Sequence, residues 1–102
     1  MIQVTRTFTR PNASIPWHDE VHSFAPFRDH MSNNYFKPNK IIVAESPTSE
    51  DQLSRTFLQI WISHEYHTEW LNDPHFQEFF AERDVYNPSV GITATERVIT
   101  EF

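Results

Sequence analysis

A strand with two apolar faces is the feature that most constrains how this chain can fold. Residues 53–63, LSRTFLQIWIS, alternate with the period of two that is typical of a strand. Their large apolar side chains divide between the two faces, with Leu58, Ile60 and Ile62 on one and Phe57 and Trp61 on the other. The helices of so short a chain can cover only one face of its sheet, so the other face needs a second cover.

We expect the face with Phe57 and Trp61 to be the one that the helices leave open. Large exposed aromatic patches are uncommon on monomers, and the simplest cover for such a face is the same sheet of a second copy. We therefore predict a homodimer with Phe57 and Trp61 at its interface. A pair of tolerated surface aromatics is the alternative.

Three further strands are indicated by alternation and by β-branched composition. They are residues 2–10, IQVTRTFTR, residues 40–46, KIIVAES, and residues 92–102, ITATERVITEF. Between the first two strands, large apolar residues recur at the spacing of a helix: Trp17, Val21, Phe24, Phe27 and Met31. Pro26 should kink or split that helix, and Asn33-Asn34 can end it.

A second helical region follows the strand at 53–63. Ser63 is a good N-cap for it, and the stretch Asn72-Asp73-Pro74 should interrupt it, because Asp73 can cap and Pro74 can open a new helix. The order is thus strand, helix, strand, strand, helix, strand. This order predicts one α+β domain over residues 1–102, a ferredoxin-like βαββαβ fold with a four-stranded antiparallel sheet and both helices on one face.

Composition excludes several classes of function. The net charge is −6 and the few basic residues are scattered, so a nucleic-acid surface is not expected. The chain has no cysteine and one glycine, which removes thiol chemistry and glycine-rich phosphate loops. The longest aliphatic run, residues 41–44, is too short to span a membrane, and the first residues have no apolar signal segment. We expect a cytoplasmic protein.

Histidines suggest a metal site, but their spacing argues against it. His64 and His67 are three residues apart, whereas a zincin motif needs histidines four apart on one face of a helix. His18 and His22 have the four-residue spacing, in a setting of ordinary polar helix surface. We predict no metal and no other cofactor.

The second helical region carries a family resemblance. The run Ile60-Trp61-Ile62-Ser63, then Glu69-Trp70-Leu71-Asn72-Asp73-Pro74-His75-Phe76 and Phe79-Phe80, resembles the central motif of the antibiotic-biosynthesis monooxygenase (ABM) superfamily. The resemblance implies a dimeric α/β barrel, in which two ferredoxin-like subunits pack sheet to sheet. The motif is most similar to that of the heme-degrading monooxygenases, which have a Trp at the position of Trp70.

Two positions depart from that heme-degrading pattern. Those enzymes have a heme-ligating His ten residues after the Trp and an Asn in the first strand, where this chain has Phe80 and Thr5. Because phenylalanine cannot ligate iron, the resemblance does not extend to heme degradation.

Two classes of function stay open. The first is a cofactor-independent monooxygenase that acts on a small aromatic or polyketide-like compound in a pocket between sheet and helices. Its candidate catalytic residues are Trp70, His67 and His75, and its candidate pocket residues are Thr5, Tyr66, Trp70, Phe76 and Phe80. The second is a non-catalytic module that binds a small hydrophobic ligand or serves assembly. A sizeable cavity that touches Trp70 favours the first, and an interior filled by phenylalanines favours the second.

Overall fold

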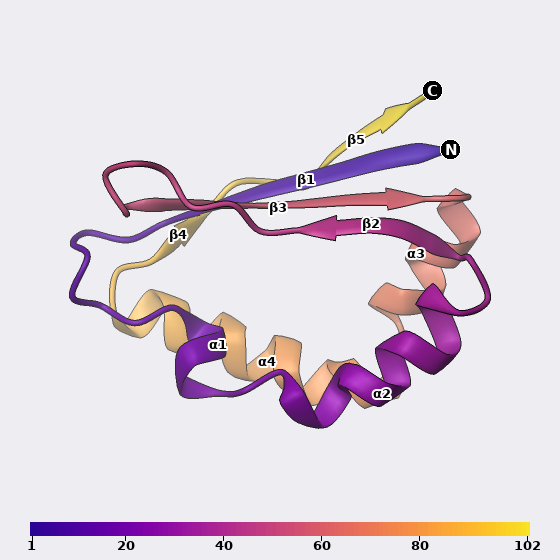
Figure 1. The fold of residues 1–102 in the computed structure, drawn as a ribbon. Helices are drawn as coiled ribbons and strands as arrows, with labels where there is room; N and C mark the ends of the chain where they lie inside the picture. Colours follow the sequence, from indigo (N-terminus) through magenta and orange to yellow (C-terminus); the bar gives the residue numbers. More distant parts are fainter.

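One antiparallel sheet lies above a layer of helices in the computed structural model, which describes residues 1–102 (Figure 1). The strands are β1 (Ile2–Thr9), β2 (Ile41–Glu45), β3 (Ser54–Trp61), β4 (Thr93–Ala94) and β5 (Val98–Glu101). Their order is β2-β3-β1-β4, and β5 pairs with β1 as well. Together, β4 and β5 take the place of the single last strand that was predicted over 92–102.

The helices lie on one face of this sheet. They are α1 (His18–Val21), α2 (Arg28–Met31), α3 (His64–Leu71) and α4 (Pro74–Ser89). Figure 1 shows α1, α2 and α4 beneath the sheet, and α3 at the end where the two termini lie side by side. The predicted order of elements and the ferredoxin-like arrangement are therefore confirmed. No helix is both long enough and apolar enough to cross a membrane.

The helix ends follow the predicted signals in the second helical region and depart from them in the first. Ser63 caps α3 by accepting a hydrogen bond from the Tyr66 N–H, and Asp73 caps α4. In the first region a 3-10 turn at Ala25–Phe27, which contains Pro26, separates α1 from α2. The chain does not leave the helix at Asn33-Asn34. It continues as a π-helical turn, Ser32–Phe36.

Trp61 lies on the helix-covered face of the sheet, so the prediction that it contacts a second copy is wrong. It pairs with Ile2 of β1, and its exposed fraction is 0% within the single chain. Its ring lies 5.9 Å from that of Tyr35 and 5.7 Å from that of Trp70. The helices cover this face because it carries the largest apolar rings of the sheet, which gain most from burial. Phe57 lies on the same face of β3 as Trp61, so its predicted place at the open face of the sheet is wrong as well.

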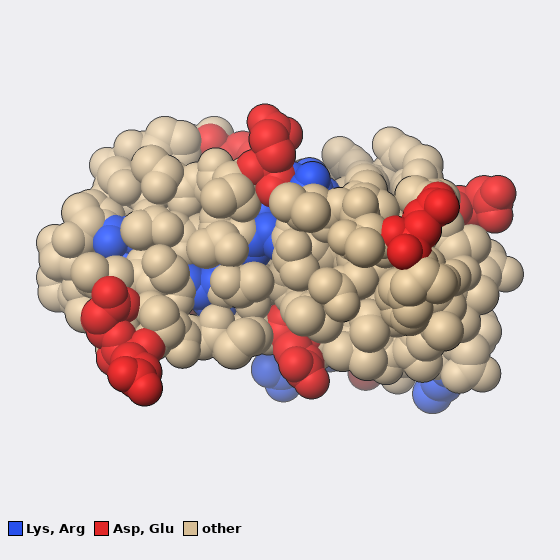
Figure 2. Space-filling view, turned by 90° about the horizontal axis from the view of Figure 1, so that it is seen from above, with Lys and Arg blue, Asp and Glu red and all other residues tan.

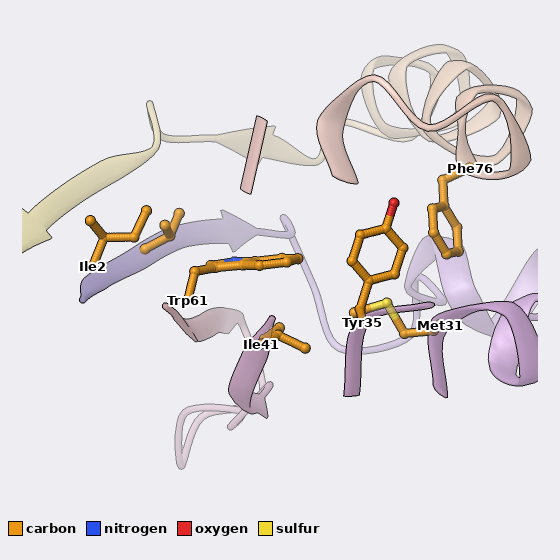
Figure 3. Close-up of a cluster of buried hydrophobic side chains, with 7 residues drawn as sticks. Ile2, Met31, Tyr35, Ile41, Trp61 and Phe76 are labelled. Carbon is orange, nitrogen blue, oxygen red and sulfur yellow. The ribbon is translucent and has the colours of Figure 1, made fainter. Parts of the chain in front are cut away.

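The core is divided into two clusters of buried side chains. The larger cluster contains Ile2, Val4, Met31, Tyr35, Ile41, Trp61 and Phe76, and Figure 3 shows it with all but Val4 labelled. The smaller cluster contains Phe8, Trp17 and Ile92. Strand β1 contributes Ile2 and Val4 to the first and Phe8 to the second, with Arg6 between them. The sheet and the helices are thus joined by apolar contacts at two separate places.

The other face of the sheet has no helical cover. The register places on it Val43 of β2, Leu58 and Ile60 of β3, and Val98 of β5. These side chains are half-buried or exposed within the single chain. Figure 2 looks onto this face, where most of the visible atoms belong to uncharged residues.

His67 is buried between sheet and helix, with an exposed fraction of 3%. Its ring lies 5.6 Å from that of Trp61, and its Nε2 has no hydrogen-bond partner. Burial lowers the pKa of His67 to about 4, and the positive charges of Arg97 and His64 add to this effect. The folded state therefore holds His67 in its neutral form.

We predict that the free energy of unfolding falls as the pH drops from about 6.5 to about 4, because in that range the unfolded chain binds a proton at His67 that the folded chain does not. Keeping His67 neutral contributes on the order of 3 kcal/mol to the free energy of unfolding. This contribution is fully present above pH 6.5. Urea denaturation at a series of pH values measures it. His67→Gln should flatten the slope, whereas His64→Gln, on the exposed side of α3, removes only the smallest of the three causes and should reduce the slope slightly. A slope in the His67→Gln variant equal to that of the wild type would contradict the assignment.

Candidate ligand pocket

A cavity of about 400 Å³ opens between the sheet and the helices. Eight phenylalanine and tryptophan rings line it: Phe8, Trp17, Phe24, Phe36, Phe57, Trp70, Phe79 and Phe80. Its lining draws on residues of both core clusters, so it lies where the apolar contacts between sheet and helices are interrupted. A volume of this size is in the usual range for a small-molecule site.

Five of the six arginines of the chain line this cavity: Arg6, Arg28, Arg55, Arg83 and Arg97. Only two carboxylates, Asp19 and Glu45, line it with them. Asp19 forms an ion pair with Arg55, at 2.8 Å between Oδ1 and the guanidinium nitrogen. The cavity is therefore strongly positive in a chain whose net charge is −6.

Strand alternation brings Arg6 and Arg55 into the cavity. Arg6 lies between Val4 and Phe8 on the helix-facing side of β1, and Arg55 pairs directly with Phe8. Both arginines thus occupy positions that an ordinary core would fill with apolar residues.

An irregularity in the last strand brings in Arg97. Phe8 pairs with Ala94 and Thr5 with Val98, so two residues of β1 face three residues, 95–97. This is the residue count of a β-bulge, and the extra residue reverses the alternation of side chains. As a result, Ile99 pairs with Val4 of the helix-facing side, and Arg97 joins that side as well. The Thr95 carbonyl holds the bulge by accepting a hydrogen bond from the Arg6 Nε at 3.0 Å.

Aromatic rings hold the guanidinium groups in place. Arg6 lies 5.0 Å and Arg83 lies 5.8 Å from the centre of the Phe8 ring. Arg83 also lies 5.0 Å from the centre of the Phe80 ring. These distances are within the range of cation–π attraction, which fixes a guanidinium while leaving its N–H donors available.

Burial and mutual repulsion act on the charges of this cluster. Burial lowers the pKa of Arg97, and the positive charges of Arg6 and Arg83 lower it further. Burial likewise lowers the pKa of Arg83, although Asp84 partly opposes the effect with a contact of 3.2 Å. The three guanidinium groups of Arg6, Arg83 and Arg97 therefore form a cluster that the carboxylates of the chain neutralise only in part.

Among the residues predicted to line a pocket, Trp70 and Phe80 line this cavity. Their rings are 5.1 Å apart and perpendicular. The other three predicted residues do not line the cavity, so the prediction is wrong for them. Thr5 pairs with Leu58 on the face away from the helices, Phe76 is fully buried in the larger core cluster, and Tyr66 is outside the lining at the exposed side of α3.

The two histidines predicted as catalytic candidates lie outside the cavity. His67 is enclosed against Trp61, and His75 stacks on His30 with 3.8 Å between the ring centres. Both His30 and His75 also contact Asp73, whose carboxylate accepts a further hydrogen bond from the Tyr35 hydroxyl. Although burial raises the pKa of Asp73, these hydrogen bonds lower it more. This network joins the start of α4 to the helical turn before β2.

His18 is the histidine that lines the cavity. Its spacing from His22 was interpreted as ordinary polar helix surface, whereas the side chain is buried. Its exposed fraction is 6%, and its Nε2 has no hydrogen-bond partner. Burial lowers the pKa of His18, and His22 and Arg83 lower it further. The lowered pKa favours the neutral imidazole near pH 7.

Two groups of side chains could hold a metal ion. His18, His22 and Glu82 form one, and His30, Asp73 and His75 form the other. In the first, His22 Nδ1 lies 3.2 Å from Glu82 Oε2. In the second, the Asp73 oxygens already accept hydrogen bonds from three neighbouring side chains.

No family model matches this chain, and no curated protein matches it in sequence. Solved structures, however, are similar to it in fold. A protein from Deinococcus radiodurans, described as an antibiotic biosynthesis monooxygenase, superposes with a TM-score of 0.66 at 8% identity, over 100% of this chain and 92% of that one. SnoaB, a cofactor-independent oxygenase from Streptomyces nogalater, superposes with a TM-score of 0.67 at 14% identity, over 99% and 91%.

A dimeric ferredoxin-like protein from an uncultured marine organism is a further match, with a TM-score of 0.55 at 10% identity, over 99% of this chain and 95% of that one. The resemblance to the ABM superfamily is thus confirmed at the level of the fold. At these identities the likeness concerns the fold alone, and the chemistry has to be argued from the residues of the cavity.

Proposed function

We propose that this protein is an ABM-type monooxygenase that binds a small aromatic compound in the cavity and oxidises it with molecular oxygen, without a cofactor. The observation that carries the proposal is an aromatic cavity of about 400 Å³ that is lined by Trp70 together with a neutral histidine, His18. The fold shared with SnoaB, a cofactor-independent oxygenase, supports the same reading.

In such a reaction the substrate supplies the electrons. Loss of a proton from an acidic ring CH₂ leaves a carbanion that is stabilised by the aromatic system. Transfer of its electrons to O₂, formation of a C–O bond and loss of water convert the CH₂ into a carbonyl, so that one CH₂ and one O₂ become one C=O and one H₂O. The protein has to remove the first proton and stabilise the anion that results.

Residues of the cavity suit both tasks. His18 is the proposed proton acceptor, because its lowered pKa keeps it unprotonated near neutral pH. The guanidinium groups of Arg6, Arg83 and Arg97 are the proposed stabilisers of the anion, because fixed positive charge lowers the pKa of a bound carbon acid. The Trp70 and Phe80 rings would pack against the substrate.

A non-catalytic ligand carrier on the same scaffold is the second candidate. The observation that favours it is that the two histidines first selected for catalysis, His67 and His75, lie away from the cavity. The two candidates differ in turnover and not in binding, so a test of oxygen uptake separates them.

We predict that the protein accelerates the oxidation of anthrone to anthraquinone with uptake of one O₂ per anthrone, as measured with an oxygen electrode. His18→Gln should lower kcat by about 100-fold, the usual size of a general-base contribution. His64→Gln is the matched control. His64 is exposed and does not line the cavity, so the variant should keep most of the activity.

A pocket-blocking variant adds a second control to this experiment. Ala44 is exposed and lines the cavity from β2, so Ala44→Trp should fill part of the cavity without disturbing the core. Oxygen uptake that persists in Ala44→Trp, or that is equal in His18→Gln and the wild type, would contradict the proposed site. Binding of anthrone without any turnover would favour the carrier.

We also propose that the protein forms a homodimer through the face of the sheet that lacks helices. Val43, Leu58, Ile60 and Val98 would lie in that interface, in place of Phe57 and Trp61. Burying these side chains against a second copy would remove from water the apolar face that the helices leave open. The structural neighbour that is described as a dimeric ferredoxin-like protein supports a dimer.

Sedimentation equilibrium at micromolar concentration should give a mass about twice the 12.1 kDa of the chain. Replacing Leu58 and Ile60 together by Glu should give a folded monomer, because two carboxylates cannot be buried unpaired at the interface. Val85→Glu, on the exposed side of α4, is the control and should remain a dimer. A wild-type mass of a single chain would refute the dimer.

A further inference from the structure

The three guanidinium groups of Arg6, Arg83 and Arg97 carry more positive charge than the single anion of the proposed reaction can balance. Four of the five lining arginines have no ion pair other than the contact of Arg83 with its neighbour Asp84. Clustered guanidinium groups repel one another, and partly buried cations without partners are costly. Although the chain has 14 acidic residues, only Asp19 and Asp84 form ion pairs with the lining arginines, Asp19 with Arg55 and Asp84 with Arg83.

The three arginines of the cluster enter the cavity from different elements. Arg6 comes from β1, Arg83 from α4, and Arg97 from the bulge between β4 and β5. Arg97 reaches the cavity only because the bulge reverses the alternation of the last strand. Three independent elements thus direct the same charged group into one cavity, as expected if a ligand provides the missing negative charge.

The donors of this cluster are available to such a ligand. The only hydrogen bonds that the side chains of Arg6 and Arg83 donate within the chain come from their Nε atoms, to the Thr95 carbonyl and to Asp84. The terminal nitrogens, which form the fork that recognises carboxylates, are left free. Because the Phe8 and Phe80 rings hold the two guanidinium planes, little side-chain entropy remains to be lost on binding.

We propose that the substrate of this cavity is an aromatic acid, a flat ring system that carries an ionised carboxylate bound by Arg6, Arg83 and Arg97. The inference rests on the proposed function in taking the cavity as the substrate site, and it adds the chemical class of the substrate. The aromatic lining excludes a small inorganic anion as the main ligand, because the ring walls would then remain in contact with water.

A pair of isosteric compounds tests the charge separately from the ring. 2-Naphthoate and 2-naphthamide have the same ring and nearly the same shape, and only the first is an anion. Isothermal titration calorimetry with the full chain should show that naphthoate binds at a single site per chain, at least about tenfold more tightly than naphthamide. Ala44→Trp should weaken the binding of both compounds, because it blocks the cavity.

Substitution of single arginines shows which side chains produce the preference for naphthoate over naphthamide. Arg97→Gln and Arg83→Gln should each remove most of the preference for naphthoate and leave the affinity for naphthamide unchanged. Lys37→Gln, which removes the same charge from an exposed site outside the cavity, should keep the preference. Without ligand, Arg97→Gln should melt at the same temperature as the wild type or higher, because a repelling charge is removed. This melting temperature also shows that the variant folds.

The outcomes separate the inference from the proposed function. Equal binding of the two compounds, weakened by Ala44→Trp, would overturn the acid preference and leave the aromatic pocket in place. A preference for naphthoate that survives both arginine substitutions would also overturn the inference, since the charge would then be recognised elsewhere. If neither compound binds, or if Ala44→Trp has no effect on binding, both the inference and the proposed function are contradicted.

Discussion

The division of the apolar core into two clusters is the constraint on which the rest of this structure depends. Trp61 and the rings around it join the sheet to the helices at one end, and Phe8 with Trp17 does so at the other. Because both contacts are built from large rings, they hold the two layers apart over the stretch between them. The cavity is therefore a consequence of where the large side chains of the core lie.

The charged residues of the cavity occupy the same inward-facing positions as the residues of the core. Arg6 occupies a helix-facing position of β1 between two core residues, and the Phe8 ring of the smaller cluster supports it together with Arg83. The aromatic residues thus serve both parts of the site, as apolar walls and as supports for the cations. This arrangement explains how an acidic protein can keep a cluster of guanidinium groups partly buried, with their outer donors directed to whatever fills the cavity.

Local patterns predicted the order of the elements and the break at Asn72-Asp73-Pro74, because caps, prolines and periodicity act over a few residues. The prediction assigned the two faces of β3 the wrong way round. Alternation shows which residues share a face of a strand, but it does not show which face the helices cover. A charged residue at an inward position, such as Arg6 between Val4 and Phe8, was a signal that could have been used. The entry of Arg97 could not be anticipated, because the bulge depends on register with β1.

A crystal structure of the protein with 2-naphthoate would show whether the arginine cluster receives a carboxylate. We expect the naphthalene ring to pack against Trp70 and Phe80, inside the cavity between the two core clusters. We expect the carboxylate to lie within hydrogen-bond distance of the guanidinium groups of Arg83 and Arg97. A naphthoate bound on the face of the sheet without helices, or one whose carboxylate points away from the arginines, would contradict this expectation.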